Sequence, residues 1–377
     1  MTSSEDQAST PQQPRINLRY LMHALLKFKA SDLHLKVGRS PIFRVKGKLI
    51  PAKMDAITKE KIKALVLEIL TEKQMEDLEV RKQLDYSFEI ADLGRFRCNV
   101  YFQKGLMSVA VRMIPQNIPD LDALNLPPVL KEMCHKVRGL VLVTGATGAG
   151  KSTTMAAMIQ YINQNRNVHI ICLEDPMEYV FRDIKSSITQ REIGSDAISY
   201  KDALIGALRQ DPDVIMIGEL RDAATIQAAL TAAETGHLVL ATLHTNDAKS
   251  SIDRILDVFP PDAQGQIRVQ LASTLVGVVS QMLMLRADST GQIPACEIMV
   301  NSPAIESYIR KNELENIPQS IATSSHYYKM QTMNQALHQL INAGTVLLQE
   351  ALKSSPSPDD LKLLLSGVDR SEGYNQN

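Results

Sequence analysis

The segment at residues 145–152, which reads GATGAGKS, constrains the fold more than any other part of the chain. The apolar run at 140–143 predicts a buried strand, and the sequence from Ser152 to about Asn163 predicts a helix. A strand, a glycine-rich loop and a helix in this order are the structural context of a nucleotide phosphate-binding loop. We therefore expect an α/β fold with a nucleoside triphosphate site here. The alternative, a turn that only joins strand to helix, is disfavoured by the terminal Lys-Ser pair.

The residue types in this loop suit phosphate chemistry. Backbone N–H groups of a glycine-rich loop, together with the N-terminus of the following helix, surround the β- and γ-phosphates. We expect Lys151 to reach the β/γ oxygens and the Ser152 hydroxyl to ligate Mg²⁺. The predicted nucleotide-binding residues of this segment are Gly145, Thr147, Gly148, Ala149, Gly150, Lys151, Ser152 and Thr153.

Three further apolar runs, at 168–173, 214–217 and 238–243, also end in polar residues. Strands that alternate with helices predict a wound parallel sheet. In such sheets ligands bind at the carboxyl ends of the strands, so we expect the polar residues to converge on the phosphate loop.

Hydrolysis of a γ-phosphate requires a carboxylate that orients or deprotonates water. Glu219 and Glu174 are the predicted catalytic carboxylates, and the sequence leaves open which is the general base. Gly218 stands where an ordinary P-loop ATPase has an Asp, which makes metal ligation depend more on Ser152 and water. His244 is expected to sense the γ-phosphate through a hydrogen bond. Further candidates for the nucleotide site are Asp175, Glu178 and His237.

Phosphoryl transfer also uses an arginine that neutralises transition-state charge and often comes from a neighbouring subunit. Arg95, Arg97 and Arg112 are the candidates. Arg95 and Arg97 alternate with Phe96 and Cys98, so both can face one side of a strand. The alternative for these arginines is a solvated sheet face.

Residues before 115 predict a separate α+β domain, because helical spacing at 18–26 is followed by several short strand-like runs. Two prolines at 115–119 predict a hinge. We expect a disordered tail at 1–14, an α+β domain at 15–114 and a hinge or linker at 115–122. An ATPase domain with C-terminal helices is expected at 123–352, followed at 353–377 by a linker, a short helix and a tail.

Composition argues against several other classes. The net charge is −1 and there is no Trp, which disfavours a nucleic-acid groove or a base-stacking surface. The four cysteines lie far apart without a C-x-x-C pair, so a zinc or redox motif is not expected. The apolar stretch 271–285 is interrupted by polar residues and predicts a core helix, not a transmembrane segment. Residues 1–14 lack the apolar region of a secretory signal.

Four motifs occur in a familiar order: 145–153, LEDPMEY at 173–179, IGELRD at 217–222 and TGHLVLATLHT at 235–245. They resemble the Walker A, Asp box, Walker B and His box of type II/type IV secretion ATPases. Within that group the chain resembles the PilT family of pilus retraction ATPases from about residue 15 to 367. Further similar segments are ASDLHL at 30–35, GRFR at 94–97 and MQTMNQAL at 330–337.

This resemblance implies a RecA-like P-loop ATPase core preceded by an N-terminal PAS-like domain, with ATP and Mg²⁺ as ligands. It implies a homohexameric ring in which ATP sits between N- and C-terminal domains, with the arginines of 94–97 and Arg112 approaching the phosphates. The implied work is type IV pilus retraction and twitching motility. The implied partners are an inner-membrane pilus platform protein and a sister retraction ATPase, at the cytoplasmic side of the inner membrane. Nucleic acid is not an expected partner.

The chain departs from the family pattern at two places. AIESYIRK at 304–311 stands where the retraction family has AIRNLIRE, and GAT at 145–147 differs from the more usual loop. The second departure keeps an accessory retraction ATPase of the PilU kind open. A pilus extension or type II secretion ATPase is disfavoured, since the paired-cysteine zinc motif and the longer N-terminal region of those proteins are absent. A RecA-like nucleic-acid translocase is the more distant alternative.

Overall fold

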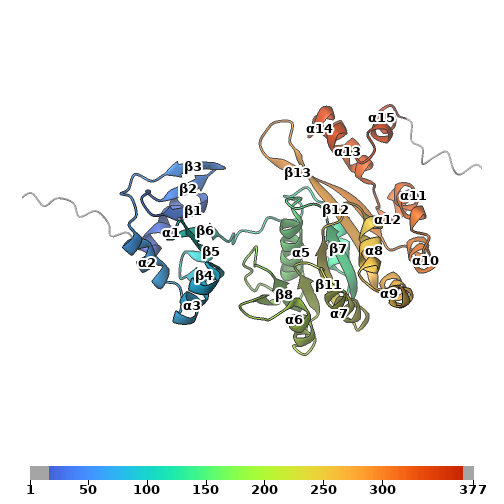
Figure 1. Ribbon diagram of the computed structural model, residues 1–377. Coiled ribbons are helices and arrows are strands. Elements are labelled where there is room, and N and C mark those ends of the chain that lie inside the picture. Colours follow the sequence, from blue (N-terminus) through green and yellow to red (C-terminus); the bar gives the residue numbers. More distant parts are fainter. Residues whose placement is uncertain (1–16, 368–377) are drawn as a thin grey trace, which may run out of the picture. The chain divides into compact units, whose positions relative to one another are not determined.

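The computed structural model describes residues 17–367, which divide into two compact units between Gln116 and Asn117 (Figure 1). Both units mix helices and strands around one sheet each, so the predicted α/β class is confirmed at this level. The predicted hinge at 115–119 spans the division, and its action as a hinge stays a prediction. The tails predicted at 1–14 and at the end of 353–377 lie outside the described residues. Among residues 17–367 every helix is too short or too polar to cross a bilayer.

The first unit packs helices on one face of a six-stranded antiparallel sheet of order β3-β2-β1-β6-β5-β4. Successive side chains of a strand point to opposite faces of the sheet. In this sheet one face is apolar: Phe96, Cys98 and Val100 are fully buried, while the residues between them are half-exposed. The elements are α1 (Leu18–Lys27), β1 (Ala30–Lys36), β2 (Ile42–Val45), β3 (Lys48–Pro51), α2 (Lys59–Leu67), α3 (Glu72–Arg81), β4 (Gln83–Ile90), β5 (Gly94–Gln103) and β6 (Leu106–Met113).

The second unit contains a seven-stranded sheet of order β13-β12-β7-β11-β10-β8-β9. All neighbouring pairs are parallel except the hairpin of β12 and β13. The strands are β7 (Gly139–Thr144), β8 (His169–Glu174), β9 (Ser187–Glu192), β10 (Val214–Ile217), β11 (Leu238–Leu243), β12 (Leu275–Leu285) and β13 (Gln292–Val300).

Helices cover both faces of this sheet, because its central strands are apolar on both sides. On one face, apolar strand side chains pack against α4 and α5 in one hydrophobic core. On the other face, the alternate strand side chains pack against helices from α6 to α11 in a second core. The helices are α4 (Val129–Cys134), α5 (Lys151–Asn165), α6 (Tyr200–Ala207), α7 (Ala223–Glu234), α8 (Ala248–Asp257), α9 (Pro261–Thr274), α10 (Pro303–Lys311) and α11 (Ile317–Thr323).

The chain ends in a smaller helical group packed on the β12–β13 hairpin through Met284, Ile293 and Ala295 (Figure 1). Helix α13 (Met333–Asn342) begins with a capping box, in which Thr332 and Gln335 satisfy each other's backbone N–H groups. Helices α14 (Leu348–Ser354) and α15 (Pro358–Leu365) belong to the same group. The short helices η1 (Leu314–Asn316) and α12 (Ser325–Tyr328) instead place Leu314 and Tyr328 at the core that contains α6 to α11.

The prediction of a core helix over 271–285 is wrong. Helix α9 ends at Thr274 and the chain continues directly into β12. The side chain of Asn301 marks this change of structure, because its Nδ2 donates to the carbonyls of Ala272 and Leu275 at 2.8 and 2.9 Å. Valines at 276, 278 and 279 suit a strand buried beside β7 better than they suit a helix.

Candidate active site

The polar residues that follow four apolar runs meet at one edge of the second sheet. Strands β7, β11, β10 and β8 are adjacent and parallel, so their carboxyl ends lie together. The phosphate loop follows β7, His244 follows β11, Glu219 follows β10, and Glu174 is the last residue of β8. The convergence expected from the sequence is therefore present.

The phosphate loop needs glycine at its two ends. Gly145 and Gly150 have φ angles of 144° and 86°, which L-residues with side chains rarely adopt. Gly150 is the N-cap of α5, so the loop passes directly into the helix and leaves the first helical N–H groups facing the loop. Lys151 and Ser152 are the first residues of α5, with Lys151 buried and Ser152 exposed.

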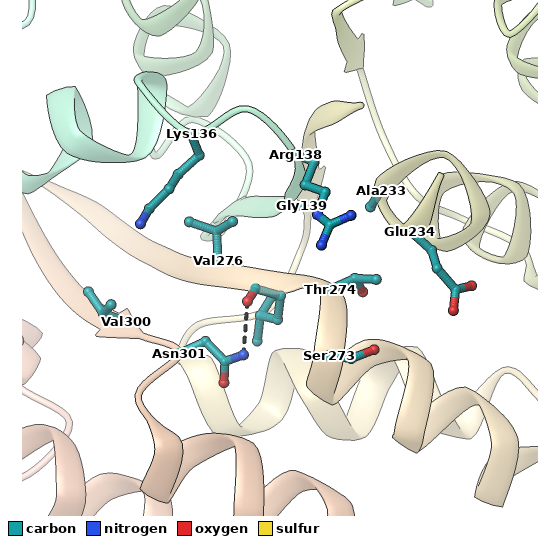
Figure 2. A pocket seen from close by; sticks show the side chains of 11 residues that line it. Lys136, Arg138, Gly139, Ala233, Glu234, Ser273, Thr274, Val276, Val300 and Asn301 are labelled. Atoms are coloured by element: carbon teal, nitrogen blue, oxygen red, sulfur yellow. Dashed lines mark hydrogen bonds between the residues drawn. The ribbon is translucent and has the colours of Figure 1, made fainter. Parts of the chain in front are cut away.

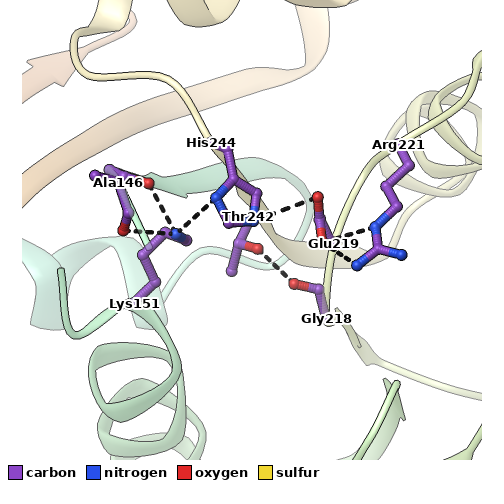
Figure 3. Close-up of polar contacts among 8 residues, drawn as sticks. Ala146, Lys151, Gly218, Glu219, Arg221, Thr242 and His244 are labelled. Atoms are coloured by element: carbon purple, nitrogen blue, oxygen red, sulfur yellow. Dashed lines mark hydrogen bonds and ion pairs between the residues drawn. The ribbon is translucent and has the colours of Figure 1, made fainter. Parts of the chain in front are cut away.

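The ammonium of Lys151 lies inside the curl of the loop (Figure 3). Its Nζ donates to the carbonyls of Gly145 and Ala146 at 2.8 and 3.1 Å, and lies 3.4 Å from Nδ1 of His244. Burial lowers the pKa of Lys151, and the negative charge of Glu219 opposes that shift. The loop thus holds a cation where phosphate oxygens would be bound.

Glu219 links the arginine of its own loop to His244 (Figure 3). Its Oε2 accepts from Arg221 Nε at 2.8 Å and Nη2 at 2.7 Å, and its Oε1 lies 3.4 Å from His244 Nε2. Burial alone raises the pKa of Glu219, but the hydrogen bond and charge of Arg221, with a contribution from His244, outweigh it and hold the pKa below its usual value. A polar chain therefore runs from Arg221 through Glu219 and His244 to Lys151.

Glu174 has the opposite electrostatic environment. It is 7% exposed, and burial raises its pKa to about 7 although it accepts hydrogen bonds. Those bonds come from the Glu178 backbone N–H and from Gln190 Nε2, both at 3.2 Å. Gln190 also donates to the carbonyl of Tyr179 at 2.8 Å, so it fixes Glu174 and the following loop together. The two predicted carboxylates thus differ in ionisation near neutral pH.

Packing explains why glycine occupies position 218. A Cβ atom built on Gly218 would lie 2.7 Å from the hydroxyl oxygen of Tyr200 and 3.3 Å from the carbonyl oxygen of Leu173. An aspartate there would therefore displace Tyr200, the first residue of α6. Nearby charges at Asp175, Arg221, Glu174 and Glu219 act on the Tyr200 hydroxyl, whose pKa is raised chiefly by burial.

The donor set near the loop fits a magnesium ion that arrives with a nucleotide. Ser152 presents an exposed hydroxyl at the start of α5. In residues 17–367 no group of three or more His, Cys, Asp or Glu side chains could hold a metal by itself. Mg²⁺ commonly keeps several waters and uses phosphate oxygens with one or two protein ligands, which is the ligation that Ser152 allows.

The remaining candidates of this unit lie in two different places. Thr153 Oγ1 is 3.0 Å from the Tyr179 hydroxyl, and Asp175 and Glu178 are exposed in the loop after β8. Thr147 and Gly148 are exposed in the phosphate loop, whereas Ala149 is buried. His237 precedes β11, and its carbonyl accepts from Gly139 at the start of β7. It therefore lies at the opposite edge of the sheet, and the structure does not bring it to this loop.

The three arginine candidates share one face of the first unit's sheet. Arg97 pairs with Arg112 across β5 and β6, and Arg95 lies two residues earlier on the same face of β5. Arg112 Nε donates to Asp32 Oδ1 at 2.7 Å, and its side chain is 66% exposed. Burial raises the pKa of Asp32, but the hydrogen bond from Ser31 and this ion pair outweigh it and lower the pKa. In this chain Arg112 is thus held by a carboxylate of its own unit.

A separate cavity of about 500 Å³ lies at the other edge of the second sheet (Figure 2). Gly139 at the start of β7 and Asn301 after β13 line it, and Lys136 and Arg138 also contribute to its wall. The phosphate loop follows the opposite end of β7, so this cavity is not the candidate nucleotide site.

Four side chains that organise the site are not predicted from the sequence: Arg221, Gln190, Tyr200 and Gln281, whose Nε2 donates to the Ala149 carbonyl in the phosphate loop. Arg221 was part of a motif, and the other three are polar side chains brought in by elements distant in the sequence. The one available signal for Gln281 was its polarity within the apolar run 275–285.

Comparison with known proteins identifies the family. Residues 6–361 match the family described as Type II/IV secretion system protein. The chain is 38% identical over 345 residues to the type IV pilus ATPase PilU of Pseudomonas aeruginosa, covering 92% of this chain and 90% of that protein. It is 39% identical over 331 residues to the retraction ATPase PilT of the same organism, covering 88% and 96%. A crystal structure of the pilus retraction motor PilT with bound ADP shares 43% identity over 92% of this chain and 99% of that chain, with a TM-score of 0.86. The chain therefore belongs to the type II/IV secretion system protein family.

Proposed function

We propose that this chain is an ATPase motor that hydrolyses ATP to drive type IV pilus retraction and twitching motility. The observation that carries the proposal is the contact series from the phosphate-loop Lys151 through His244 to Glu219. The identity to PilT over most of both chains supports retraction as the work performed. The architecture supports a RecA-like core at 123–352, a PAS-like domain at 15–114, a linker at 115–122 and a C-terminal segment at 353–377.

The two carboxylates receive different roles. Glu174 ends β8, which pairs in parallel with β10 before Glu219, so both carboxylates lie at neighbouring strand ends. A general base works best when its pKa lies near the working pH, so we assign proton removal from water to Glu174, whose pKa is about 7. Glu219, held ionised by Arg221, orients the water and any metal-bound ligand. Mg²⁺ bound to Ser152 and to phosphate oxygens would stabilise the charge that develops on the phosphates.

The same contacts provide a way to sense the γ-phosphate. Phosphate oxygens compete with the carbonyls of Gly145 and Ala146 for the Lys151 ammonium. Because Lys151 also lies 3.4 Å from His244, a change of its partners alters the contact between His244 and Glu219. His244 therefore couples occupation of the loop to the position of a catalytic carboxylate.

The assembly is proposed on the family resemblance. A homohexameric ring would place Arg95, Arg97 and Arg112 to act on bound phosphates. An inner-membrane platform protein receives the force, a sister retraction ATPase is a further partner, and the ring works at the cytoplasmic face of the inner membrane. The half-exposed face that carries the arginines is consistent with contact to another subunit.

Purified protein provides the direct test. Lys151→Ala and Glu219→Ala are expected to abolish ATP hydrolysis while leaving the hexamer intact on size-exclusion chromatography. Lys136→Ala, which removes an exposed lysine at the opposite edge of the sheet, is the matched control and should hydrolyse ATP normally. Turnover retained in both site variants would refute the site assignment. Strong, salt-sensitive stimulation by DNA would instead support a nucleic-acid translocase.

An accessory retraction ATPase is the second candidate, because PilU matches the chain about as well as PilT does, at 38% and 39% identity. The two are separated by expressing this chain as the sole retraction ATPase in a strain that lacks both kinds. Twitching restored by this chain alone indicates the retraction motor. Twitching that also requires the sister ATPase indicates the accessory role.

A further inference from the structure

Strand β12 forms the wall behind the phosphate loop. It runs parallel to β7, and the pairing ends with Ser280 beside Thr144. The two hydroxyls form a buried hydrogen bond of 2.9 Å. Gln281 is the next residue, directly beside Gly145, and a Cβ atom on Gly145 would lie 2.3 Å from the Gln281 carbonyl oxygen. The strand and the loop thus touch through backbone at the point where the loop begins.

The side chain of Gln281 reaches along the back of the loop to its other end. Its Nε2 donates to the carbonyl of Ala149, and its Oε1 accepts from Thr154 Oγ1 at 2.8 Å. Gln281 is 3% exposed and Thr154 is 2% exposed, so water does not compete for these bonds. One amide therefore holds the Ala149 carbonyl of the loop and Thr154 in the first turn of α5 at once.

The bond to Ala149 has a consequence for phosphate binding. A trans peptide is planar, so its C=O and N–H groups point in opposite directions. Gln281 holds the Ala149 carbonyl on the β12 side, and the Gly150 N–H of the same peptide is thereby directed away from β12. Backbone N–H groups of this loop are its phosphate ligands. Preorganised donors of this kind need no rearrangement when charge arrives.

We propose that Gln281 is a positioning residue for nucleotide phosphates, which fixes the Ala149–Gly150 peptide and the start of α5 in their binding orientation. The inference rests on the proposed ATPase function. Gln281 acts from a strand more than a hundred residues beyond the loop, with the Ala149 bond spanning 132 positions in sequence.

Three variants and one control test this role by MgADP affinity and by the KM and kcat for ATP. Gln281→Met keeps the length of the side chain but removes both hydrogen bonds, and Thr154→Val removes only the bond to α5. Gln281→Glu keeps an acceptor for Thr154 but replaces the donor to Ala149 with a carboxylate. Ser280→Ala, the control, removes a buried hydrogen bond of the same strand that does not involve the loop backbone.

Gln281→Met is expected to weaken MgADP binding and raise KM by about tenfold. This is the effect of losing roughly one hydrogen bond to phosphate, because the Gly150 N–H is no longer held in its binding orientation. Thr154→Val should have a smaller effect, and Ser280→Ala should stay within about twofold of the wild type. Gln281→Glu should be the most impaired at pH 8. Its MgADP affinity, relative to wild type at the same pH, should recover as the pH falls to 6, because burial favours the protonated carboxyl, whose O–H donates to the Ala149 carbonyl.

The outcomes separate this inference from the proposed function. Wild-type protein that binds MgADP but does not hydrolyse ATP would contradict the proposed function only. An active wild type with Gln281→Met within twofold of it in MgADP affinity and KM would overturn the positioning role. Equal losses in Gln281→Met and Ser280→Ala would also overturn it, since the loss would then follow from general weakening of β12. If Gln281→Met does not fold, the pH response of Gln281→Glu decides.

Discussion

The raised pKa of Glu174 makes a measurable prediction about stability. Its pKa is about 7 in the folded chain against an ordinary value of 4.5. Between these values the folded state holds a proton that the unfolded state has released. The contribution of Glu174 to the free energy of unfolding is therefore fully present below about pH 4.5 and is lost as the pH rises through 7. Glu174→Gln removes the titration and should be relatively more stable at alkaline pH.

The size of the effect follows from the two pKa values. Integrating the linkage relation from pH 5 to pH 8 gives a loss of about 2.5 kcal/mol for wild type relative to Glu174→Gln. For a unit of this size that corresponds to roughly 5–10 °C in the thermal midpoint. Glu297, whose pKa burial also raises to about 7, is present in both proteins and cancels from the difference.

Thermal unfolding of both proteins at pH 5, 6, 7 and 8 measures this difference. Glu313→Gln, which changes an exposed carboxylate in the same unit, is the control and should follow wild type at every pH. ATP hydrolysis by Glu174→Gln should be lost at every pH, so the variant gains relative stability and loses activity. A midpoint difference that stays constant from pH 5 to 8, or that grows in the opposite direction, would refute the conclusion that Glu174 is buried and binds a proton in the folded chain.

Two further changes test contacts at the site, and a third tests a helix cap in the first unit. Gly218→Ala should lower the thermal midpoint by several degrees, because the added Cβ meets the Tyr200 hydroxyl. Adding Tyr200→Phe should restore part of the lost midpoint, and no recovery would contradict the contact. Arg221→Gln should raise the pKa of Glu219, because it removes the hydrogen bond and the charge that hold this pKa below its usual value. An NMR titration of the Glu219 carboxyl measures the change, and an unmoved pKa would contradict that pairing. Thr71→Ala should cost the first unit about 1 kcal/mol in chemical unfolding by removing the α3 cap.

The sequence was informative where structure is set locally. The loop at 145–150 leads into α5, and the apolar runs form β7, β8, β10 and β11. The parallel order of these strands brings Glu219 to the edge of the sheet where the loop lies. These features depend on local pattern and on a general rule for parallel sheets. The family resemblance adds the expected assembly and the expected work, which residue patterns alone do not specify.

The remaining features depend on contacts between distant segments. Strand β12 was predicted as helix, because an apolar run without clear periodicity does not distinguish a buried strand from a buried helix. Gln281 and Gln190 gain their roles only when β12 and β9 are placed beside β7 and β8. The pairing of Arg112 with Asp32 joins residues 80 positions apart. Helix α3 was also missed, although Thr71 and Gln74 form a capping box that its sequence contains.

We expect ATP hydrolysis at Lys151 and Glu219 to power retraction of pili. The most direct measurement is a count of surface pili, together with surface motility, in a strain that lacks this gene. That strain should carry abundant pili without twitching, and the wild-type gene but not Lys151→Ala should restore twitching. Cells without pili would contradict this expectation, because they would identify an extension motor.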